Sequence, residues 1–302
     1  QTQLIIITQA DEILPCITHV LSLNKGIIKR FKTKCEFSFY LPENGNNNYP
    51  HTLNNFFNNR NTAADFEIAV KMNHVSVSYH NRIVLQNINW QVNRGERWLI
   101  KGQNGAGKST LLSLITGDHP QAYANKIILF DKKRGTGESI WDIKKKIGYV
   151  SPELQWYFDT DITCYQAIGS GFFDTIGLYK KLSAAQHDTV NKWLSFLRLS
   201  QLANKILSSV STAHQRLIML ARALVKNPPL LILDEPCQGL DNQQKDAFIQ
   251  LIDDICSNSD TTMIYVSHYD NEIPLCINNI FHLKSEDHNI KPTCNSHAAV
   301  AV

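Results

Sequence analysis

A glycine-rich loop constrains the fold of this chain more than any other feature of its sequence. The loop reads Gly102-Gln103-Asn104-Gly105-Ala106-Gly107-Lys108-Ser109 and fits the pattern GxxxxGK[ST]. Glycine accepts backbone angles that other residues rarely adopt, so we expect Gly105 and Gly107 to turn successive N–H groups inward around phosphate oxygens. The pattern therefore predicts a phosphate-binding loop, provided that a strand precedes it and a helix follows it.

The segments that flank the loop have the pattern that such a loop requires. Residues 98–100 are apolar like a buried strand, and residues 109–115 have the apolar spacing of a helix that Gly117 would end. The positive end of this helix favours phosphate. We expect Lys108 to reach the β- and γ-phosphates and the Ser109 hydroxyl to ligate Mg²⁺. The predicted cofactor-binding residues are Gly102, Gln103, Asn104, Gly105, Ala106, Gly107, Lys108, Ser109 and Thr110.

A second apolar strand, at residues 230–233, ends in two adjacent carboxylates, Asp234 and Glu235. At the carboxyl end of a strand beside the phosphates, Asp234 can hold Mg²⁺. Glu235 is then placed to polarise the water that attacks the γ-phosphate. The alternative is an exposed strand end without chemistry, and the phosphate loop upstream favours the catalytic interpretation. Three further short strands are expected at residues 75–79, 83–85 and 88–92.

In this order, the motifs resemble the nucleotide-binding domain of ABC ATPases over roughly residues 66–285. The resemblance implies an α/β fold, a P-loop NTPase of ABC type. This fold has a RecA-like mixed sheet core, an antiparallel β subdomain and a helical subdomain. The resemblance also implies that Tyr79 stacks on adenine, although an ordinary strand aromatic is an equal alternative. It further implies that Gly239-Leu240-Asp241 connects two such domains and that His268 contacts the γ-phosphate. The implied cofactors are ATP and Mg²⁺.

Two segments depart from the pattern of that family. Its signature segment normally has two adjacent glycines whose backbone approaches ATP on a partner domain, whereas this chain has Thr212 and Ala213. Side chains at these positions would hinder that contact and slow hydrolysis. The family also usually has a glutamine that contacts Mg²⁺ and water where this chain has Pro152. Glu153 and Gln155 are nearby, but neither is at the expected position.

A narrower resemblance is to the ModF-like branch of the family, whose members are described as molybdate-transport or photorepair ATP-binding proteins. Segments 135–143, 149–155, 170–177 and 236–241 carry it. The branch has two tandem nucleotide-binding domains, which agrees with a weak internal repeat of a buried strand, a turn and a second strand. The repeat aligns residues 4–11 with residues 263–270, and the second strand of each copy is expected at residues 20–23 and 280–283.

The tandem arrangement predicts how the chain divides. We expect residues 1–42 to be the carboxyl end of a first nucleotide-binding domain and residues 43–65 to be an Asn-rich linker. Residues 66–285 would be the second domain, and residues 286–302 a disordered tail. Gln9 stands where the first domain would have its switch histidine, so that half is expected to be catalytically degenerate.

Composition argues against several classes of function. The formal net charge is only +3, so we expect no nucleic-acid partner. Seven cysteines are scattered without a CxxC pair, which favours reduced thiols over a zinc site or a disulfide framework. No apolar run is long enough to cross a bilayer, so the chain is not itself transmembrane. The expected localisation is cytoplasmic, or peripheral at the inner face of the plasma membrane.

The leading hypothesis is an ABC-type ATPase that couples ATP hydrolysis to transport, of the molybdate type. Its catalytic residues would be Lys108, Glu235 as general base and His268 as sensor of the γ-phosphate, and its metal ligands Ser109 and Asp234. The expected partners are a second nucleotide-binding domain, in tandem or as a homodimer, and a membrane permease. The alternatives are an ATP-binding regulatory module with weak hydrolysis and a translation-associated ABC protein.

Overall fold

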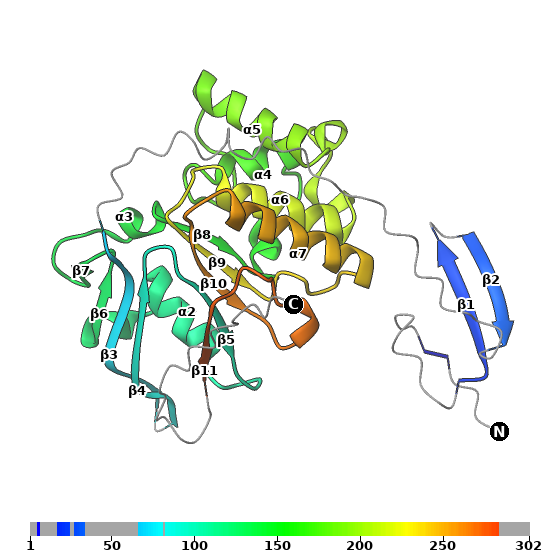
Figure 1. Cartoon of the computed structure of the whole chain (residues 1–302). Helices are drawn as coiled ribbons and strands as arrows, with labels where there is room; N and C mark the ends of the chain where they lie inside the picture. The colour runs from blue at the N-terminus through cyan, green and yellow to red at the C-terminus, as the bar shows by residue number, and fades with distance from the viewer. Residues whose placement is uncertain (1–4, 7–16, 25–26, 34–65, 81, 284–302) are drawn as a thin grey trace, which may run out of the picture. The chain divides into compact units, whose positions relative to one another are not determined.

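The computed structural model describes residues 5–6, 17–24, 27–33, 66–80 and 82–283 of the chain. The chain separates into two compact units, Gln1–Asn48 and Tyr49–Val302, and each is described on its own (Figure 1). In the first unit, β1 (His19–Asn24) pairs antiparallel with β2 (Ile27–Thr33). The strand expected at residues 20–23 lies within β1. The expected linker at 43–65 and tail at 286–302 lie outside the described residues.

The other strand expected in the first unit is wrong where the structure describes it. Ile5 and Ile6 belong to no strand, and their side chains are exposed. An apolar strand is held by hydrogen bonds and packing from neighbouring strands. Among the described residues, no strand pairs with these two, so the apolar run alone does not make a strand.

A five-stranded sheet forms the centre of the second unit, in the order β11-β5-β10-β9-β8. All four of its pairings among the described strands are parallel. Its three inner strands, β5, β10 and β9, are near-continuous apolar runs, as expected for strands buried on both faces, whereas the edge strand β11 has polar residues at both ends. Their bounds are β5 (Arg97–Lys101), β8 (Ile147–Val150), β9 (Leu230–Asp234), β10 (Thr262–Val266) and β11 (Asn279–His282).

A separate antiparallel sheet has the order β4-β3-β6-β7. Its bounds are β3 (Ile68–Tyr79), β4 (Arg82–Asn93), β6 (Lys126–Leu129) and β7 (Lys132–Lys133). The expectation of two strands at residues 83–85 and 88–92 is wrong, because both lie in the continuous β4. The polar residues between them make an irregularity rather than a turn: Asn87 has φ 51°, and its N–H donates to Ser76 Oγ at 2.9 Å.

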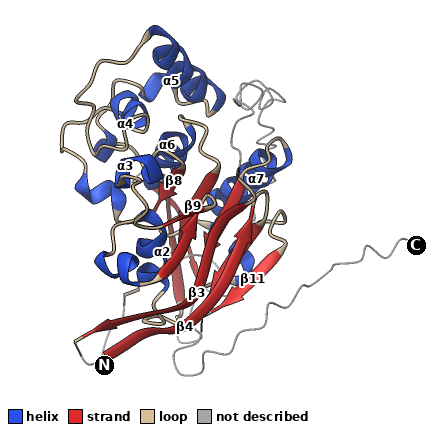
Figure 2. Ribbon diagram, turned by 90° about the vertical axis from the view of Figure 1, so that its left-hand side faces the viewer, coloured by secondary structure: helices blue, strands red, loops and turns tan. Residues whose placement is uncertain are grey.

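Six described α-helices surround these sheets, with shorter 3₁₀ turns between them. They are α2 (Lys108–Thr116), α3 (Ile140–Lys144), α4 (Cys164–Ser170), α5 (Ala184–Phe196), α6 (Thr212–Leu224) and α7 (Asn242–Ser257). The 3₁₀ turns are Pro120–Ala124, Leu154–Tyr157, Ser200–Leu202, Leu207–Ser209 and Asp270–Glu272. Figure 2 shows α4 and α5 at the end of the unit away from β3 and β4.

Two hydrophobic clusters hold these layers together. One joins α4, α5, α6 and α7 to the parallel sheet, with Trp193, Leu231 and Tyr265 among its members. The other joins the antiparallel sheet and α2 to the parallel sheet, with Trp90, Leu111 and Ile264 among its members. The predicted α/β fold with an antiparallel β subdomain and a helical subdomain is confirmed. Within the described ranges, no helix is long and apolar enough to span a membrane.

Candidate functional site

The glycine-rich loop connects the carboxyl end of β5 to the first residue of α2, as its sequence predicted. Gly105 and Gly107 have φ values of 80° and 95°, in the left-handed region that favours glycine. A Cβ atom on Gly107 would lie 2.8 Å from Leu85 Cδ2 on β4, so packing also restricts this position. Gly107 is the N-cap of α2 and has no side chain to cover the helix terminus. The N–H groups of the first turn therefore remain available for phosphate oxygens.

The side chain of Lys108 lies across its own loop. Its Nζ donates to the carbonyl oxygens of Gly102 at 2.7 Å and Gln103 at 3.2 Å. Burial lowers the pKa of Lys108, while the carboxylates of Glu235 and Asp234 act in the opposite direction. This places a lysine ammonium directly beside the loop, where phosphate oxygens would compete with the two carbonyls for its protons.

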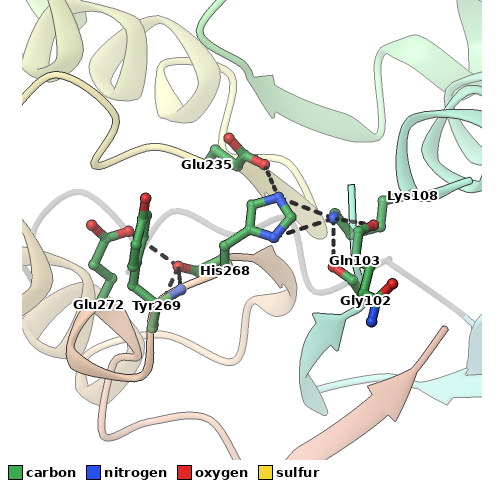
Figure 3. Close-up of polar contacts among 8 residues, drawn as sticks. Gly102, Gln103, Lys108, Glu235, His268, Tyr269 and Glu272 are labelled. Carbon is green, nitrogen blue, oxygen red and sulfur yellow. Dashed lines mark hydrogen bonds and ion pairs between the residues drawn. The ribbon is translucent and has the colours of Figure 1, made fainter. Parts of the chain in front are cut away.

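The ring of His268 lies between Lys108 and Glu235, as Figure 3 shows. His268 Nε2 is 2.7 Å from Glu235 Oε1 and 3.0 Å from Lys108 Nζ, and Nδ1 is 3.5 Å from the same Nζ. Glu235 directly follows β9, and His268 follows β10 by two residues. Because β9 and β10 are parallel neighbours, their carboxyl ends bring these side chains to one edge of the sheet.

One nitrogen cannot serve both neighbours at once. If Nε2 of His268 carries the proton and donates to Glu235, it has no lone pair for Lys108. Nδ1 then remains as the acceptor that faces Lys108 Nζ, at the longer distance of 3.5 Å. The geometry therefore fits a histidine whose ring orientation is set by Glu235 and whose other nitrogen faces the phosphate-binding lysine.

Asp234 ends β9 among a group of carboxylates. Burial raises its pKa to about 6, and the negative charges of Glu235 and Glu153 add to that shift. Lys108 and a hydrogen bond from Tyr149 oppose it. A divalent cation would relieve the repulsion among these carboxylates, so the site fits Mg²⁺. Mg²⁺ commonly takes one or two protein oxygens and completes its shell with phosphates and water, which agrees with Asp234 and Ser109 as the candidate ligands.

Within the described part of the chain, no group of three or more His, Cys, Asp and Glu residues is arranged to hold a metal ion by itself. The proposed Mg²⁺ site does not need such a group, because the phosphates supply further oxygen ligands. Sequence reasoning missed Tyr149 and placed no role on Glu153. The feature that could have indicated Tyr149 is its position on β8, because β8 pairs with β9 and aligns Tyr149 with Ile232.

Tyr79 is the last residue of β3, and its ring is half exposed. Its hydroxyl is 2.8 Å from His119 Nε2, and the two rings meet edge to face with centroids 5.7 Å apart. The contact with His119 therefore holds the tyrosine ring in place, and the exposed part of the ring is left for a flat partner. Stacking of Tyr79 on adenine stays a prediction.

The loop after β9 carries the expected inter-domain segment. Glu235 holds φ 45°, and its N–H donates to Val266 O at 3.0 Å, which fixes the start of the loop. Asp241 caps α7 through a hydrogen bond from Gln244 N–H at 2.9 Å. Arg216 on α6 donates to Gln238 O at 3.1 Å and is buried. The loop is therefore tied at its start to the parallel sheet, in its middle to α6 and at its end to α7.

The segment in the position of the family signature forms the N-terminus of α6. Ser211 is its N-cap and accepts a hydrogen bond from His214 N–H. Thr212 is exposed and Ala213 is half-buried, so side chains stand where the family pattern has bare backbone. A Cβ atom on Gly239 would lie 3.4 Å from Thr212 Cγ2, which places this terminus beside the inter-domain loop of the same chain.

Pro152 lies between β8 and the 3₁₀ turn Leu154–Tyr157. Ser151 precedes Pro152, and its Oγ accepts a hydrogen bond from Leu154 N–H, at the start of that turn, at 3.2 Å. Glu153, not Pro152, is the residue of this segment whose charge acts on Asp234. The side chain of Gln155, which is not at the position the family pattern expects, lies outside the described residues.

A P-loop between β5 and α2, with an acidic strand end and a histidine on neighbouring parallel strands, defines a P-loop nucleotide-binding domain. The family model "ABC transporter" matches residues 85–238. The chain belongs to the ABC transporter family and contains an ABC-type ATPase domain of the ModF-like kind.

Individual relatives support the family assignment. The chain is 48% identical over 212 residues to the ABC transporter ATP-binding protein ModF of Escherichia coli (strain K12), covering 70% of this chain and 43% of ModF. It is 31% identical to the zinc uptake system ATP-binding protein ZurA of Listeria innocua, covering 66% of this chain and 76% of ZurA. The structure of cbiO1 from Clostridium perfringens, part of the ABC transporter complex cbiONQ, aligns with a TM-score of 0.62. That alignment has 25% identity and covers 72% of this chain and 86% of cbiO1.

The chain spans less than half the length of two of the curated relatives that it matches: 43% of ModF and 44% of a Schizosaccharomyces pombe protein. The matching region in this chain is about 70% of its length. What those longer proteins do as a whole is therefore considered only as a proposal for this chain.

Proposed function

We propose that this domain hydrolyses ATP with Lys108, Ser109 and Asp234 on the Mg²⁺–ATP complex, Glu235 as general base and His268 as the group that contacts the γ-phosphate. The observation that carries the proposal is the position of His268, 2.7 Å from Glu235 and within contact of Lys108. These residues come from the first turn of α2, the end of β9 and the segments that follow β9 and β10, so the fold assembles them from separate parts of the chain.

Each group has a defined task in this proposal. Lys108 and the N–H groups at the start of α2 bind and orient the phosphates. Mg²⁺ supplies charge neutralisation on the β- and γ-phosphates when it is bound. Glu235 accepts a proton from the attacking water, and His268 keeps Glu235 oriented toward the phosphate loop through the 2.7 Å contact.

Mg·ATP turnover of the chain and of Glu235→Gln tests this assignment. General-base catalysis contributes about 10²- to 10⁴-fold, so we expect kcat to fall by at least about 10²-fold. ATP binding should persist, because Lys108 and the loop are unchanged. Turnover that is equal in the parent and Glu235→Gln would remove Glu235 from this role. Binding without turnover in both would remove the hydrolysis proposal.

The same proposal includes a second nucleotide-binding domain. The Thr212–Ala213 terminus of α6 lies beside Gly239, and it matches the segment that meets ATP on a partner domain in this family. We propose that the partner is a tandem first domain, with residues 1–42 as its carboxyl end, or a second copy of this chain. The coverage of 43% of ModF supports the tandem arrangement. Sedimentation with and without Mg·ATP distinguishes a dimer of this chain from a monomer.

A transport role is the wider part of the proposal. One relative is named as a zinc uptake protein and another as ModF, so similarity supports an energy-coupling subunit without selecting a cargo. Molybdate is the cargo that the narrower resemblance suggests. A membrane permease would then hold the chain at the inner face of the membrane. Co-purification of a permease with the chain from detergent-solubilised membranes would test this role.

A second candidate function is a nucleotide-responsive regulatory module with slow hydrolysis. It is favoured by Thr212 and Ala213, whose side chains stand at the exposed start of α6. Replacing both with glycine discriminates between the two functions. A gain in ATPase rate would show that the signature segment limits turnover in this chain. No gain would place the limit elsewhere.

A further inference from the structure

A buried ion pair lies on the side of His268 that faces away from the phosphate loop. Glu272 Oε1 is 3.0 Å from Lys245 Nζ, and Glu272 Oε2 accepts a hydrogen bond from Ser267 Oγ at 3.1 Å. The Glu272 side chain is only 7% exposed and that of Lys245 only 18%, so water screens the pair weakly. This arrangement differs from the exposed surface pairs of the domain, which contribute little.

The pair is joined to the backbone on both sides of His268. Ser267, which precedes His268, accepts a hydrogen bond from Tyr269 N–H at 3.1 Å. Lys245 Nζ also lies 5.7 Å from the centre of the Tyr269 ring. Glu272 and Lys245 therefore act on the residue before His268 and the residue after it, and Figure 3 shows Glu272 and Tyr269 beside the His268 turn.

Lys245 brings a second element into this contact. It stands in the first turns of α7, and its N–H donates to the carbonyl oxygen of Asp241, the N-cap of that helix, at 2.8 Å. Asp241 ends the Gly239–Leu240–Asp241 segment, which the family resemblance assigns to contact between two domains. The start of α7 is thus connected through one ion pair to the turn that carries His268.

We propose that Lys245 and Glu272 are positioning residues that hold His268 against Glu235 and make its orientation depend on the start of α7. This inference rests on the proposed function of His268 in ATP hydrolysis. A shift of the inter-domain segment would move Asp241 and the first turn of α7, and Lys245 would carry that movement to Glu272 and Ser267. This movement would finally change the contact of His268 with Glu235. Docking of a partner domain would therefore regulate catalysis through that contact.

The surroundings of Glu272 favour positioning over a simple contribution to stability. Glu272 is close enough to Cys237 and Tyr265 to raise the pKa of both groups, although burial is the larger cause for each. Cys237 lies two residues after Glu235, and Tyr265 lies on β10 before His268. The carboxylate is therefore enclosed by the two segments that carry the general base and the histidine.

The test compares Lys245→Met with the parent, with Lys245→Arg as the conservative variant. Lys192→Met is the control, because Lys192 also forms an ion pair, with Asp188, but that pair lies on the exposed face of α5. We expect Lys245→Met to lower kcat on the order of tenfold with KM for ATP nearly unchanged, since small misplacements of a reacting group cost up to about 10²-fold. Lys245→Arg should recover most of the loss, and Lys192→Met should match the parent.

Combination with His268→Ala separates positioning from general damage. If Lys245 acts through His268, adding Lys245→Met to His268→Ala should lower kcat no further. An equal additional loss in that background would overturn the proposal. A kcat for Lys245→Met equal to that of the parent would also overturn it.

A second readout keeps the test independent of turnover. The imidazole resonances of His268, identified by their loss in His268→Ala, should shift in Lys245→Met and not in Lys192→Met. If the parent binds ATP without hydrolysing it, the proposed function fails, and these resonances decide the positioning role alone. Unshifted resonances would then overturn it. Glu272→Gln repeats the measurement from the other side of the pair, and Lys245→Met remains informative if Glu272→Gln does not fold.

Discussion

The imidazole Nε2 of His268 lies 2.7 Å from Oε1 of Glu235, although the two residues follow different strands. The contact depends on β9 and β10 being parallel neighbours with their carboxyl ends at the same edge. It gives Glu235 a fixed partner on the side of the phosphate loop. A histidine in this position can orient the carboxylate without being the base itself.

Replacing Lys108 tests the phosphate contact directly. We expect Lys108→Met to weaken ATP binding by about 10- to 150-fold, because a hydrogen bond to a charged group is worth about 1.5–3 kcal/mol. Titration with a fluorescent ATP analogue measures the affinity. The fold should survive, since Met can occupy the stem of a side chain that is 8% exposed. Unchanged affinity in a folded variant would contradict the role of Lys108.

The two central glycines of the loop should respond differently to alanine. Both have positive φ, so each substitution strains the backbone. Only at Gly107 would the new Cβ also meet Leu85, at 2.8 Å, whereas the space around Gly105 is open within 4 Å. We expect Gly107→Ala to lower the free energy of unfolding by about 1–3 kcal/mol more than Gly105→Ala. Urea unfolding without nucleotide measures the difference, and equal losses would refute the packing role of Gly107.

The raised pKa of Asp234 predicts a pH-dependent stability. Burial, then Glu235 and Glu153, raise this pKa from 3.8 to about 6 in the folded chain. The folded state therefore binds the proton more tightly than the unfolded state, and stability falls as pH rises from about 4 to about 6. Asp234→Asn removes this loss, so we expect it to stabilise the chain by roughly 1–3 kcal/mol at pH 7 and not at pH 4.

Urea unfolding at several pH values, without ATP and Mg²⁺, measures this effect. Asp188→Asn on the exposed face of α5 serves as the control and should show no such pH dependence. Saturating Mg·ATP should then stabilise the parent more than Asp234→Asn, because the variant lacks a charged metal ligand. A stability gain of Asp234→Asn that is the same at pH 4 and pH 7 would argue that the carboxylate is not destabilised by its neighbours.

Tyr79 can be tested by separating its ring from its hydroxyl. Stacking of a base on an aromatic side chain is worth about 1–3 kcal/mol, so Tyr79→Ala should weaken ATP affinity about 5- to 150-fold. Tyr79→Phe keeps the ring and removes only the 2.8 Å contact with His119, so its affinity should stay close to that of the parent. Comparing ATP with inorganic triphosphate isolates the base: the triphosphate should bind Tyr79→Ala and the parent equally. Equal ATP affinity in Tyr79→Ala would assign the ring to structure alone.

The local patterns predicted those parts of the domain that depend on residues close in sequence. The strand at 98–100, the helix ended by Gly117 and the strand before Asp234 all appear as expected, since their boundaries follow from apolar runs and a glycine in the left-handed conformation. The prediction of a turn at Asn87, within β4, is wrong. Polar residues at this point are typical of a turn, and only the pairing of β4 with β3 on both sides of Asn87 keeps the strand continuous.

The sequence by itself determined that this chain has a phosphate loop, a carboxylate pair after a buried strand and the order of motifs of its family. Only the tertiary structure decided which side chains meet. It brought Tyr149 and Glu153 to Asp234 and set the ring of His268 between Lys108 and Glu235. It also paired Glu272 with Lys245 of α7. The physical reason is that spacing along the chain fixes local conformation, whereas contacts between segments depend on the order and direction of strands in the sheet.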